Sequence, residues 1–270
     1  MTTNLVKRRL KAASIVAAFL FTCALATSAQ QPADNTYIEA ATLWQQSSGE
    51  ARALEYQTYV LARMLLDRDL RNRRIRMRRA IIVDVDETIL DNSRYQGMLI
   101  KKGVNYPEGW TDWCNRAEAT SIPGALDFLR YAHSRGVRVF YVTNRKIAEK
   151  DGTARNLKSL GFPEVSDETL LVRTDTQNDS KEPRRKSVTS RYHVVLLMGD
   201  NLNDFSDVFE KSKTVASRLE ATEKNRSQFG THFIVLPNAM YGDWENSIYE
   251  YNFKLSSAEK QAKRRALLKD

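Results

Sequence analysis

Residues 81–93, IIVDVDETILDNS, decide the fold because an apolar segment runs directly into two acidic residues. The β-branched residues 81–83 predict a short buried strand. Asp84 and Asp86 follow at the end of that strand, and side chains two residues apart point to the same face of an extended chain. Two converging carboxylates repel each other, so we expect a positive charge at this spot, and a divalent cation suits hard oxygen ligands.

Strands and helices alternate through the rest of the chain. Apolar runs predict further strands at 137–142, near 170–172, at 193–198 and at 232–236. Predicted helices lie between them: one from Pro123 to Gly136, one that ends near Leu160 before Gly161, a basic one from about Lys181, and a long polar one from Asp204. Such alternation is typical of right-handed crossovers and a parallel sheet, in which ligands bind at the carboxyl ends of the strands.

The segment before residue 81 is predicted to form helices, and it ends in a run of arginines. Residues 35–70 indicate two helices joined near residues 48 and 49, with a capping box made by Ser47 and Glu50. The second helix is expected to bury a stripe of Leu54, Leu61 and Leu65. Residues 68–79, RDLRNRRIRMRR, hold seven arginines. We interpret this run as a solvated connection rather than as a site for an anionic surface.

Residues 1–29 have the pattern of a secretory signal peptide. Four basic residues precede an apolar stretch from Ala12 to Ala26, and small residues follow as far as Ala29. The apolar stretch is short for a membrane span. We therefore expect cleavage after Ala29 rather than a retained transmembrane anchor, and a mature chain that is periplasmic or secreted.

The charge of the chain limits the class of partner, and its cysteine content bears on disulfides. The chain holds 42 Lys and Arg against 33 Asp and Glu, and four of the basic residues lie in residues 1–29, so the remainder carries a formal charge of +5. This mild excess suits an anionic substrate but is too small to indicate a nucleic acid polymer. Cys114 is the only cysteine outside residues 1–29, so no intramolecular disulfide is expected.

Polar residues follow three of the predicted strands. They are Asp84 and Asp86 after the first, Thr143 and Asn144 after the second, and Asp200 and Asp204 after the strand at 193–198, with Lys181 at the start of the basic helix. The carboxyl ends of parallel strands meet at one edge, so all of these can face one crevice, a set that fits metal-assisted chemistry on a phosphoryl group.

Simpler interpretations explain these acidic residues only in part. An EF-hand loop is not expected, because Ile89 stands where such a loop needs glycine. Helix capping could explain Asp204 alone, but not acidic residues placed after two apolar strands. The spacing of the histidines does not suggest zinc.

Four segments resemble the motifs of the haloacid dehalogenase (HAD) superfamily and, more narrowly, of its class C acid phosphatases. They are VDVDETILDNSRYQ (83–96), YVTNR (141–145), SKEPRR (180–185) and LMGDNLNDF (197–205), and similarity extends to 43–57 and 236–245. The resemblance implies a Rossmann-like α/β fold, with a parallel sheet flanked by helices. Within residues 30–270 it implies a helical extension at 30–79, a catalytic core at 80–254 with a small cap inserted near 94–120, and a C-terminal helix at 255–270.

The resemblance also implies a role for each aspartate. Asp84 would be the nucleophile that forms an aspartyl-phosphate. Asp86 would protonate the leaving oxygen and later deprotonate a water molecule, and an acidic medium favours the first of these steps. Mg²⁺ would be bound by Asp84, the backbone carbonyl of Asp86 and Asp200, with Asp204 binding it through water or orienting the other ligands.

By the same resemblance, Thr143 and Asn144 would bind the phosphate, and Lys181 rather than Lys186 would neutralise its charge. Aromatic residues are expected around the leaving group: Tyr95, Trp110, Trp113 and Tyr241. Stacking on a base predicts 5′-nucleotides among the substrates. The alternative is that Trp110 and Trp113 only pack the cap.

The expected function is that of a Mg²⁺-dependent acid phosphatase acting on small phosphomonoesters. A carbon–halogen hydrolase of the same superfamily is disfavoured because a halide needs no acid such as Asp86. A non-catalytic binding protein is disfavoured by the intact set of site residues. A homodimer is expected by resemblance alone. Many class C enzymes are lipoproteins, but Thr22 precedes Cys23 where a lipobox needs a small residue, so lipid attachment is not expected.

Overall fold

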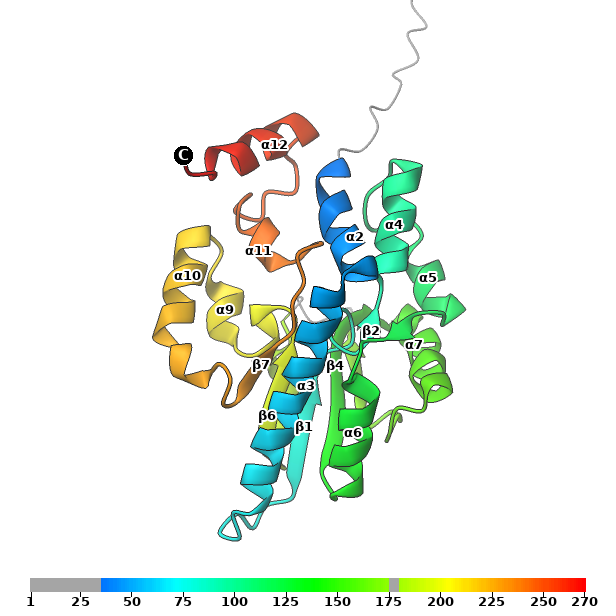
Figure 1. Ribbon diagram of the computed structural model, residues 1–270, viewed down its shortest axis with the longest axis vertical. Helices are drawn as coiled ribbons and strands as arrows, with labels where there is room; N and C mark the ends of the chain where they lie inside the picture. Colours follow the sequence, from blue (N-terminus) through cyan, green and yellow to red (C-terminus); the bar gives the residue numbers. More distant parts are fainter. Residues whose placement is uncertain (1–34, 175–179) are drawn as a thin grey trace, which may run out of the picture. The chain divides into compact units, whose positions relative to one another are not determined.

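The computed structural model describes residues 35–174 and 180–270, and Asp34–Asp270 form one compact unit. In this unit helices flank a parallel sheet, which confirms the predicted α/β fold (Figure 1). The expected signal peptide, residues 1–29, lies outside the described residues. None of the helices in the described ranges has the length and apolar character of a membrane span.

Five parallel strands form the central sheet, in the order β5-β4-β1-β6-β7. Their bounds are Arg79–Val83 for β1, Arg138–Lys146 for β4, Leu170–Arg173 for β5, His193–Gly199 for β6 and Phe233–Val235 for β7. β1 is central, and every side chain from Ala80 to Val83 is buried. A strand buried on both faces needs a continuous apolar run, which is why the sequence predicts these strands to within a few residues.

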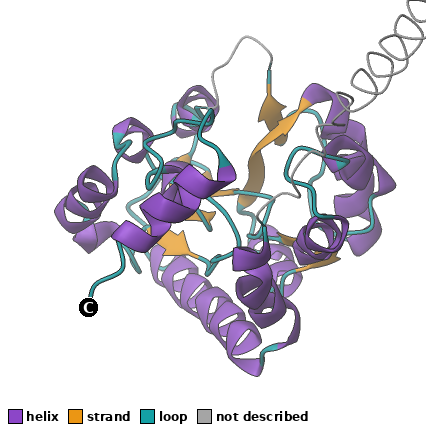
Figure 2. Ribbon diagram, turned by 90° about the horizontal axis from the view of Figure 1, so that it is seen from above, coloured by secondary structure: helices purple, strands orange, loops and turns teal. Residues whose placement is uncertain are grey.

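Helices cover both faces of the sheet (Figure 2). The face that carries Ile81 and Val83 packs against α3 (Gly49–Leu70), α6 (Ala125–Ser134) and α7 (Ile147–Leu160). The face that carries Ile82 packs against α8 (Glu182–Thr189), α9 (Asp207–Lys211) and α10 (Val215–Lys224). Alternating side chains of one strand therefore serve two separate cores.

The N-terminal helices begin with η1 (Thr36–Ile38) and α2 (Glu39–Ser47), and α3 follows directly. The predicted joint near residue 48 is confirmed, but the predicted capping box of Ser47 and Glu50 is wrong. Ser48 is the N-cap of α3, and its hydroxyl oxygen accepts a hydrogen bond from the Ala51 backbone N–H at 2.9 Å. The Ser47 hydroxyl instead donates to the Leu43 carbonyl oxygen at 2.5 Å, within α2.

α3 packs through a different face from the predicted one. Leu65 is buried as expected, but Leu54 and Leu61 are 41% and 37% exposed. Tyr59 is buried in their place, and its hydroxyl donates to the Thr88 carbonyl oxygen. Because a tyrosine that finds a hydrogen-bond partner can enter the core, it fixes the rotation of this helix, which a count of leucines does not reveal.

A segment with its own two-stranded sheet follows β1. The antiparallel pair β2 (Leu90–Asp91) and β3 (Thr120–Ser121) brackets α4 (Ser93–Lys102) and α5 (Trp110–Arg116). α5 lies tightly against α7, because a Cβ atom on Gly152 would come within 2.4 Å of the Cys114 carbonyl oxygen. This close approach fixes the end of the segment against α7.

The chain after β6 is more broken than predicted. In place of one long helix from Asp204 it forms η2 (Leu202–Asp204), α9 and α10, and then η3 (Arg226–Gln228). The break has a local cause, because Ser206 caps α9 and Thr214 caps α10 through their side-chain oxygens. After β7 the chain ends with α11 (Asp243–Asn246) and α12 (Ser257–Ala266).

Candidate functional site

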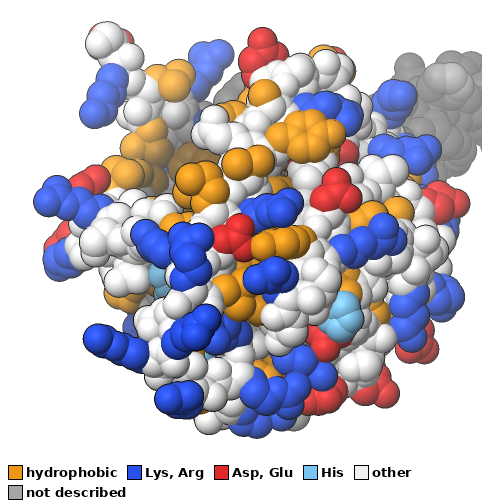
Figure 3. Space-filling model, turned by 60° about the horizontal axis from the view of Figure 1, so that its bottom comes forward, with side chains coloured by type: hydrophobic (Ala, Val, Ile, Leu, Met, Phe, Trp, Pro, Cys, Tyr) orange, Lys and Arg blue, Asp and Glu red, His pale blue; other side chains and the backbone are white. Residues whose placement is uncertain are grey.

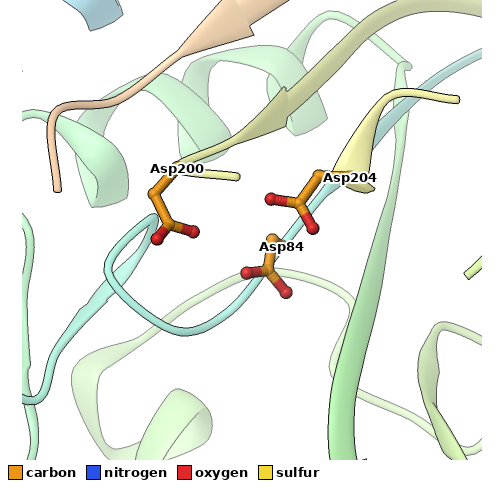
Figure 4. Close-up of side chains that lie close together, drawn as sticks. All are labelled: Asp84, Asp200 and Asp204. Carbon is orange, nitrogen blue, oxygen red and sulfur yellow. The ribbon is translucent and has the colours of Figure 1, made fainter. Parts of the chain in front are cut away.

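Three carboxylates meet at the carboxyl ends of β1 and β6 (Figure 4). Asp84 follows β1, Asp200 follows β6, and Asp204 ends η2. Each offers an oxygen atom, and these atoms all lie within 4.8 Å of one another. Asp84 and Asp204 are buried. The structure therefore brings together three of the residues that the sequence places at the predicted site.

Lys181 supplies the positive charge within this acidic cluster. It immediately precedes α8 and is buried, and its Nζ donates to Asp84 Oδ1 and, at 2.7 Å, to Asp204 Oδ1. Lys186 lies on the exposed side of the same helix and pairs with Glu182 at 3.4 Å. Of the two lysines considered for the phosphate, Lys181 is the one that reaches the aspartates.

Asp204 is held from two directions. Its Oδ2 accepts a hydrogen bond from the Asn201 backbone N–H at 3.0 Å, while its Oδ1 binds Lys181. A Cβ atom on Gly199 would lie 2.2 Å from Asp204 Oδ2, so any side chain at that position would displace the carboxylate. Asp204 thus both caps a turn and faces the cluster.

Asp200 is oriented by a residue that sequence reasoning missed. Asn238, in the segment after β7, donates through Nδ2 to Asp200 Oδ2 at 2.8 Å. Thr88 lies on the other side, with its Oγ1 3.5 Å from Asp200 Oδ1. Both residues fall in segments that resemble the family, but neither stands at the end of an apolar run, so spacing alone gives them no role.

Burial is the largest cause of the pKa shifts of Asp84 and Asp200 in the acidic cluster. It raises the pKa of Asp84 to about 7, although the Lys181 ammonium opposes this shift. Burial likewise raises the pKa of Asp200 well above its usual range, and Asp204 adds to the effect. Burial lowers the pKa of Lys181, but its two carboxylate partners outweigh burial and the net direction is upward. Three carboxylates around one ammonium leave the cluster short of positive charge, which favours a bound cation.

We expect the metal-free protein to lose stability as the pH rises from about 4 to about 7. The folded state keeps a proton on Asp84 up to about pH 7, because burial raises the pKa of this group from 3.8. The contribution of this group to the free energy of unfolding is therefore present below pH 4 and is lost as the pH rises through about 7, amounting to a few kcal/mol at most. Melting temperatures of EDTA-treated protein across this range measure the slope.

The control for this experiment is Asp84→Asn, which removes one titrating group and should reduce the slope, while Asp200, whose pKa burial also raises, still contributes to it. Added Mg²⁺ should flatten it as well, since a bound cation holds the carboxylate in its ionised form. A slope that is unchanged in the variant would assign the pH dependence to other groups.

Asp86 is not one of the three carboxylates whose oxygens lie within 4.8 Å of one another, although its charge still raises the pKa of Asp84. β1 ends at Val83, so the alternation of an extended strand no longer applies at residue 86. The Asp86 carboxylate is instead held by Arg145, with NH2 at 2.8 Å and Nε at 3.0 Å from Oδ1. Asn92 Nδ2 donates to the same oxygen at 2.9 Å.

Arg145 is the main site residue that sequence reasoning missed. It lies on β4, is only 2% exposed, and donates from NH1 to Thr153 Oγ1 at 3.0 Å. Burial lowers its pKa, but the Asp86 carboxylate outweighs burial and the net direction is upward. Arg145 therefore stays charged and fixes the orientation of Asp86. The signal that could have identified Arg145 is its place at the end of the motif YVTNR, where a charged residue follows an apolar run.

Asn92 joins several parts of the site through one buried amide. Its Oδ1 accepts from Trp113 Nε1 at 2.8 Å and from Arg145 NH2 at 3.3 Å, while its Nδ2 binds Asp86. Its backbone N–H donates to Glu87 Oε1 at 2.8 Å. The structure thus ties the loop after β1 to α5 and β4 through this residue.

Thr143 and Asn144 lie within β4 rather than after it. Thr143 is fully buried, with its Oγ1 3.4 Å from Asp86 Oδ2 and 3.1 Å from the Arg145 backbone nitrogen, so it faces the site. Asn144 is exposed, and its Oδ1 accepts from Arg184 NH2 at 2.6 Å. Of the two residues predicted to bind phosphate, Thr143 reaches Asp86, whereas Asn144 contacts Arg184.

The predicted aromatic residues separate into buried and accessible ones. Tyr95 and Trp113 are buried, and in this structure they pack the segment around α4 and α5. Trp110 is partly exposed, packs edge-on against Tyr95 at 5.0 Å between ring centroids, and lies 5.4 Å from the Arg145 guanidinium. Tyr241 lines a hollow of about 320 Å³ that opens beside Asp200, and its hydroxyl donates to Glu87.

The donor set of the acidic cluster fits a magnesium ion. Mg²⁺ takes oxygen ligands and is commonly held by one or two carboxylates together with water and phosphate oxygens. Asp84, Asp200 and Asp204 supply such oxygens at one point, and nitrogen or sulfur donors are absent from this group of three. The carboxylate of Asp86 is not one of the three.

Comparisons with known proteins agree across most of the chain. A sequence model of the family described as HAD superfamily, subfamily IIIB (Acid phosphatase), matches residues 4–244. Two solved structures of the class C acid phosphatase from Bacillus anthracis, one with tungstate bound, are each 42% identical to this chain, with TM-scores of 0.83 and 0.84. Each match covers 87% of this chain and 98% of the other. The range matched by the family includes every aspartate of the site.

Proposed function

Since this chain belongs to the acid phosphatases of the HAD superfamily, subfamily IIIB, and so hydrolyses phosphomonoesters, we propose that Asp84 is its nucleophile and Mg²⁺ its cofactor. One observation carries the proposal: the buried Asp84 carboxylate lies beside both Asp200 and Asp204 and is bonded to Lys181. The cluster combines a nucleophile with a cation site, which is what phosphoryl transfer to a carboxylate needs.

The proposed reaction has two steps on the protein. A carboxylate oxygen of Asp84 forms a bond to phosphorus while the bond from phosphorus to the ester oxygen breaks, and Asp86 gives its proton to that leaving oxygen. Water then attacks the aspartyl-phosphate, Asp86 takes the proton from this water, and Asp84 is released with inorganic phosphate. Arg145 keeps the Asp86 carboxylate in one orientation throughout.

The remaining residues bind charge. Lys181 and Thr143 are proposed to contact the phosphate oxygens, since both already lie at the aspartates. Asp84, Asp200 and Asp204 would hold Mg²⁺, with the backbone carbonyl of Asp86 as a further ligand. When bound, Mg²⁺ supplies charge neutralisation, so that an anionic nucleophile can approach an anionic phosphate.

We also propose that 5′-nucleotides are among the substrates and that the enzyme acts in the periplasm or outside the cell after removal of residues 1–29. The support for nucleotides is the accessible ring of Trp110, which lies beside the Arg145–Asp86 pair and offers a stacking surface. The support for export is the sequence pattern of residues 1–29 alone. A homodimer remains a proposal from family resemblance.

Removal of metal should abolish activity. We expect release of inorganic phosphate from p-nitrophenyl phosphate to fall by at least about a hundredfold in EDTA, because the acidic cluster then repels the phosphate, and to return on addition of excess Mg²⁺. Full activity in EDTA would exclude the proposed cofactor.

The same assay with nucleoside monophosphates and sugar phosphates tests the substrate class, and an equal response to both would remove the case for base stacking.

A further inference from the structure

We propose that the arginine loop, residues 68–79, is a docking surface for the phosphate-bearing face of an anionic lipid bilayer. The loop joins α3 to β1, and six of its seven arginines are exposed: Arg68, Arg71, Arg73, Arg74, Arg76 and Arg78. In residues 35–174 and 180–270, none of these six lies within ion-pair distance of a carboxylate. The structure thus presents a cluster of positive charge that the protein itself does not neutralise.

The acidic residues next to the loop are already engaged. Asp69 pairs with Arg79 at 2.6 Å and with His193 at 2.8 Å. Asp67 accepts a hydrogen bond from the Tyr131 hydroxyl. Both oxygens of Asp69 are thus taken, and in the described parts of the chain Asp67 forms no ion pair with any of the six exposed arginines.

The loop is also held in shape. The seventh arginine, Arg79, reaches back from β1 and donates from NH2 to the carbonyl oxygens of Asp69 and Asn72, at 2.9 Å each. The Asn72 side chain accepts from the Arg74 backbone N–H at 3.1 Å. These hydrogen bonds fix the backbone of the turn that bears the exposed guanidinium groups. A fixed turn loses less conformational entropy when it binds a surface.

The helix dipole of α3 explains only part of the arginine cluster in residues 68–79. Basic residues near the C-terminus of a helix are stabilised by the helix dipole, and this accounts for Arg68 and Arg71 at the end of α3. The dipole effect falls off within one turn, so it does not account for Arg73, Arg74 and Arg76. Like charges held this close repel one another, and a bound anionic surface would relieve that repulsion.

The position of the loop suits docking. It precedes β1, whereas Asp84 follows β1, so the loop and the catalytic cluster lie at opposite ends of one strand. In Figure 1 the loop forms the end of the unit farthest from α4 and α12. Figure 3 shows that face, on which Lys and Arg side chains predominate over acidic ones. Binding there would leave the active site open to water.

The composition of the loop favours a lipid surface over a nucleic acid. Arginine binds phosphate oxygens through two parallel hydrogen bonds, which suits phosphate headgroups. Met77 is 49% exposed among the arginines, and an apolar side chain of this kind can enter the interface of a bilayer. Residues 68–79 contain no aromatic side chain, the group on which proteins stack single-stranded bases.

The test is sedimentation of the full chain with vesicles. Binding is expected to vesicles of phosphatidylcholine with phosphatidylglycerol, to weaken as NaCl is raised, and to be lost on phosphatidylcholine alone. The variant Arg71→Gln/Arg73→Gln/Arg74→Gln/Arg76→Gln should bind the anionic vesicles at least about a hundredfold more weakly, since each basic residue at such a surface contributes roughly fivefold. Its phosphatase activity should equal that of the parent, which also shows that it folds.

A matched variant removes the same charge elsewhere: Lys101→Gln/Lys102→Gln/Lys254→Gln/Lys269→Gln, all at exposed positions. It should keep vesicle binding to within about threefold, because these residues lie outside the loop. Equal loss in both variants would reduce the effect to net charge and overturn the proposal. Equal binding to neutral vesicles, or tighter binding to a single-stranded oligonucleotide at the same ionic strength, would overturn it as well. If the fourfold variant does not fold, Arg73→Gln/Arg76→Gln takes its place.

Discussion

Asp84→Asn will lower kcat for phosphate release by at least about a thousandfold. Asparagine has almost the shape of aspartate, but its amide cannot attack phosphorus to form an acyl phosphate. The site offers no substitute at that point, because the Asp86 carboxylate is bound to Arg145 and the other carboxylates of the cluster follow a different strand. Release of inorganic phosphate at saturating substrate and saturating Mg²⁺ is the measurement.

Two variants separate loss of the nucleophile from loss of the cation. Asp200→Asn keeps the nucleophile, so high Mg²⁺ should restore much of its activity, whereas Asp84→Asn should not respond. The control for any change of acid to amide is Asp167→Asn, whose side chain is 97% exposed and should leave activity unchanged. Acid quenching with radiolabelled substrate should leave label on the parent protein and none on Asp84→Asn. Label on that variant would contradict the role of Asp84.

Asp86→Asn should have an effect that depends on the leaving group. An alkyl phosphate releases a strongly basic alkoxide, which needs a proton, so kcat should fall by about 10²–10⁴-fold. p-Nitrophenolate is a weak base and can leave without being protonated, so the first step with p-nitrophenyl phosphate should be affected far less. Arg145 and Asn92 can still bind the oxygen of the new amide, so the position of the side chain should be kept.

The informative comparison is between the two substrates in the same variant. Single-turnover rates isolate the first step from hydrolysis of the intermediate, in which Asp86 acts as a base for both substrates. Equal losses for both leaving groups in that first step would show that Asp86 acts by position or charge and not as a proton donor. Arg145→Lys adds a second check, because a lysine cannot reproduce the two contacts to the carboxylate and should weaken the same step.

Much of the fold could be predicted from the sequence because a parallel sheet is buried on both faces. Residues 81–83 and 193–198 are continuous apolar runs, and each forms part of a strand of the parallel sheet. The carboxyl ends of parallel strands lie at one edge of the sheet, so Asp84 and Asp200 could be placed at the same edge from the sequence. The structure adds that β1 and β6 are neighbours, which brings the two carboxylates together. Local pattern and global topology agree at these positions.

The predictions failed where geometry depends on contacts between distant residues. The partner of Asp86 is Arg145, 59 positions away, and no periodicity in either segment indicates the pair. Leu54 and Leu61 resemble a core stripe, but a tyrosine hydrogen bond sets the rotation of α3. The long helix expected from Asp204 is interrupted by serine and threonine caps, which weigh more than the helical tendency of the intervening residues.

The contact between Gly199 and Asp204 has a consequence for the resting enzyme. A methyl group at position 199 would collide with this carboxylate, which occupies the space that glycine leaves and is held there by Lys181 and by the Asn201 backbone N–H before any substrate arrives. A charge that is fixed in advance needs no rearrangement when the reaction begins, and such preorganisation is a major source of enzymatic rate. An alanine at this glycine would therefore disturb the site much as a mutation of Asp204 would, although the residue itself has no functional group to offer.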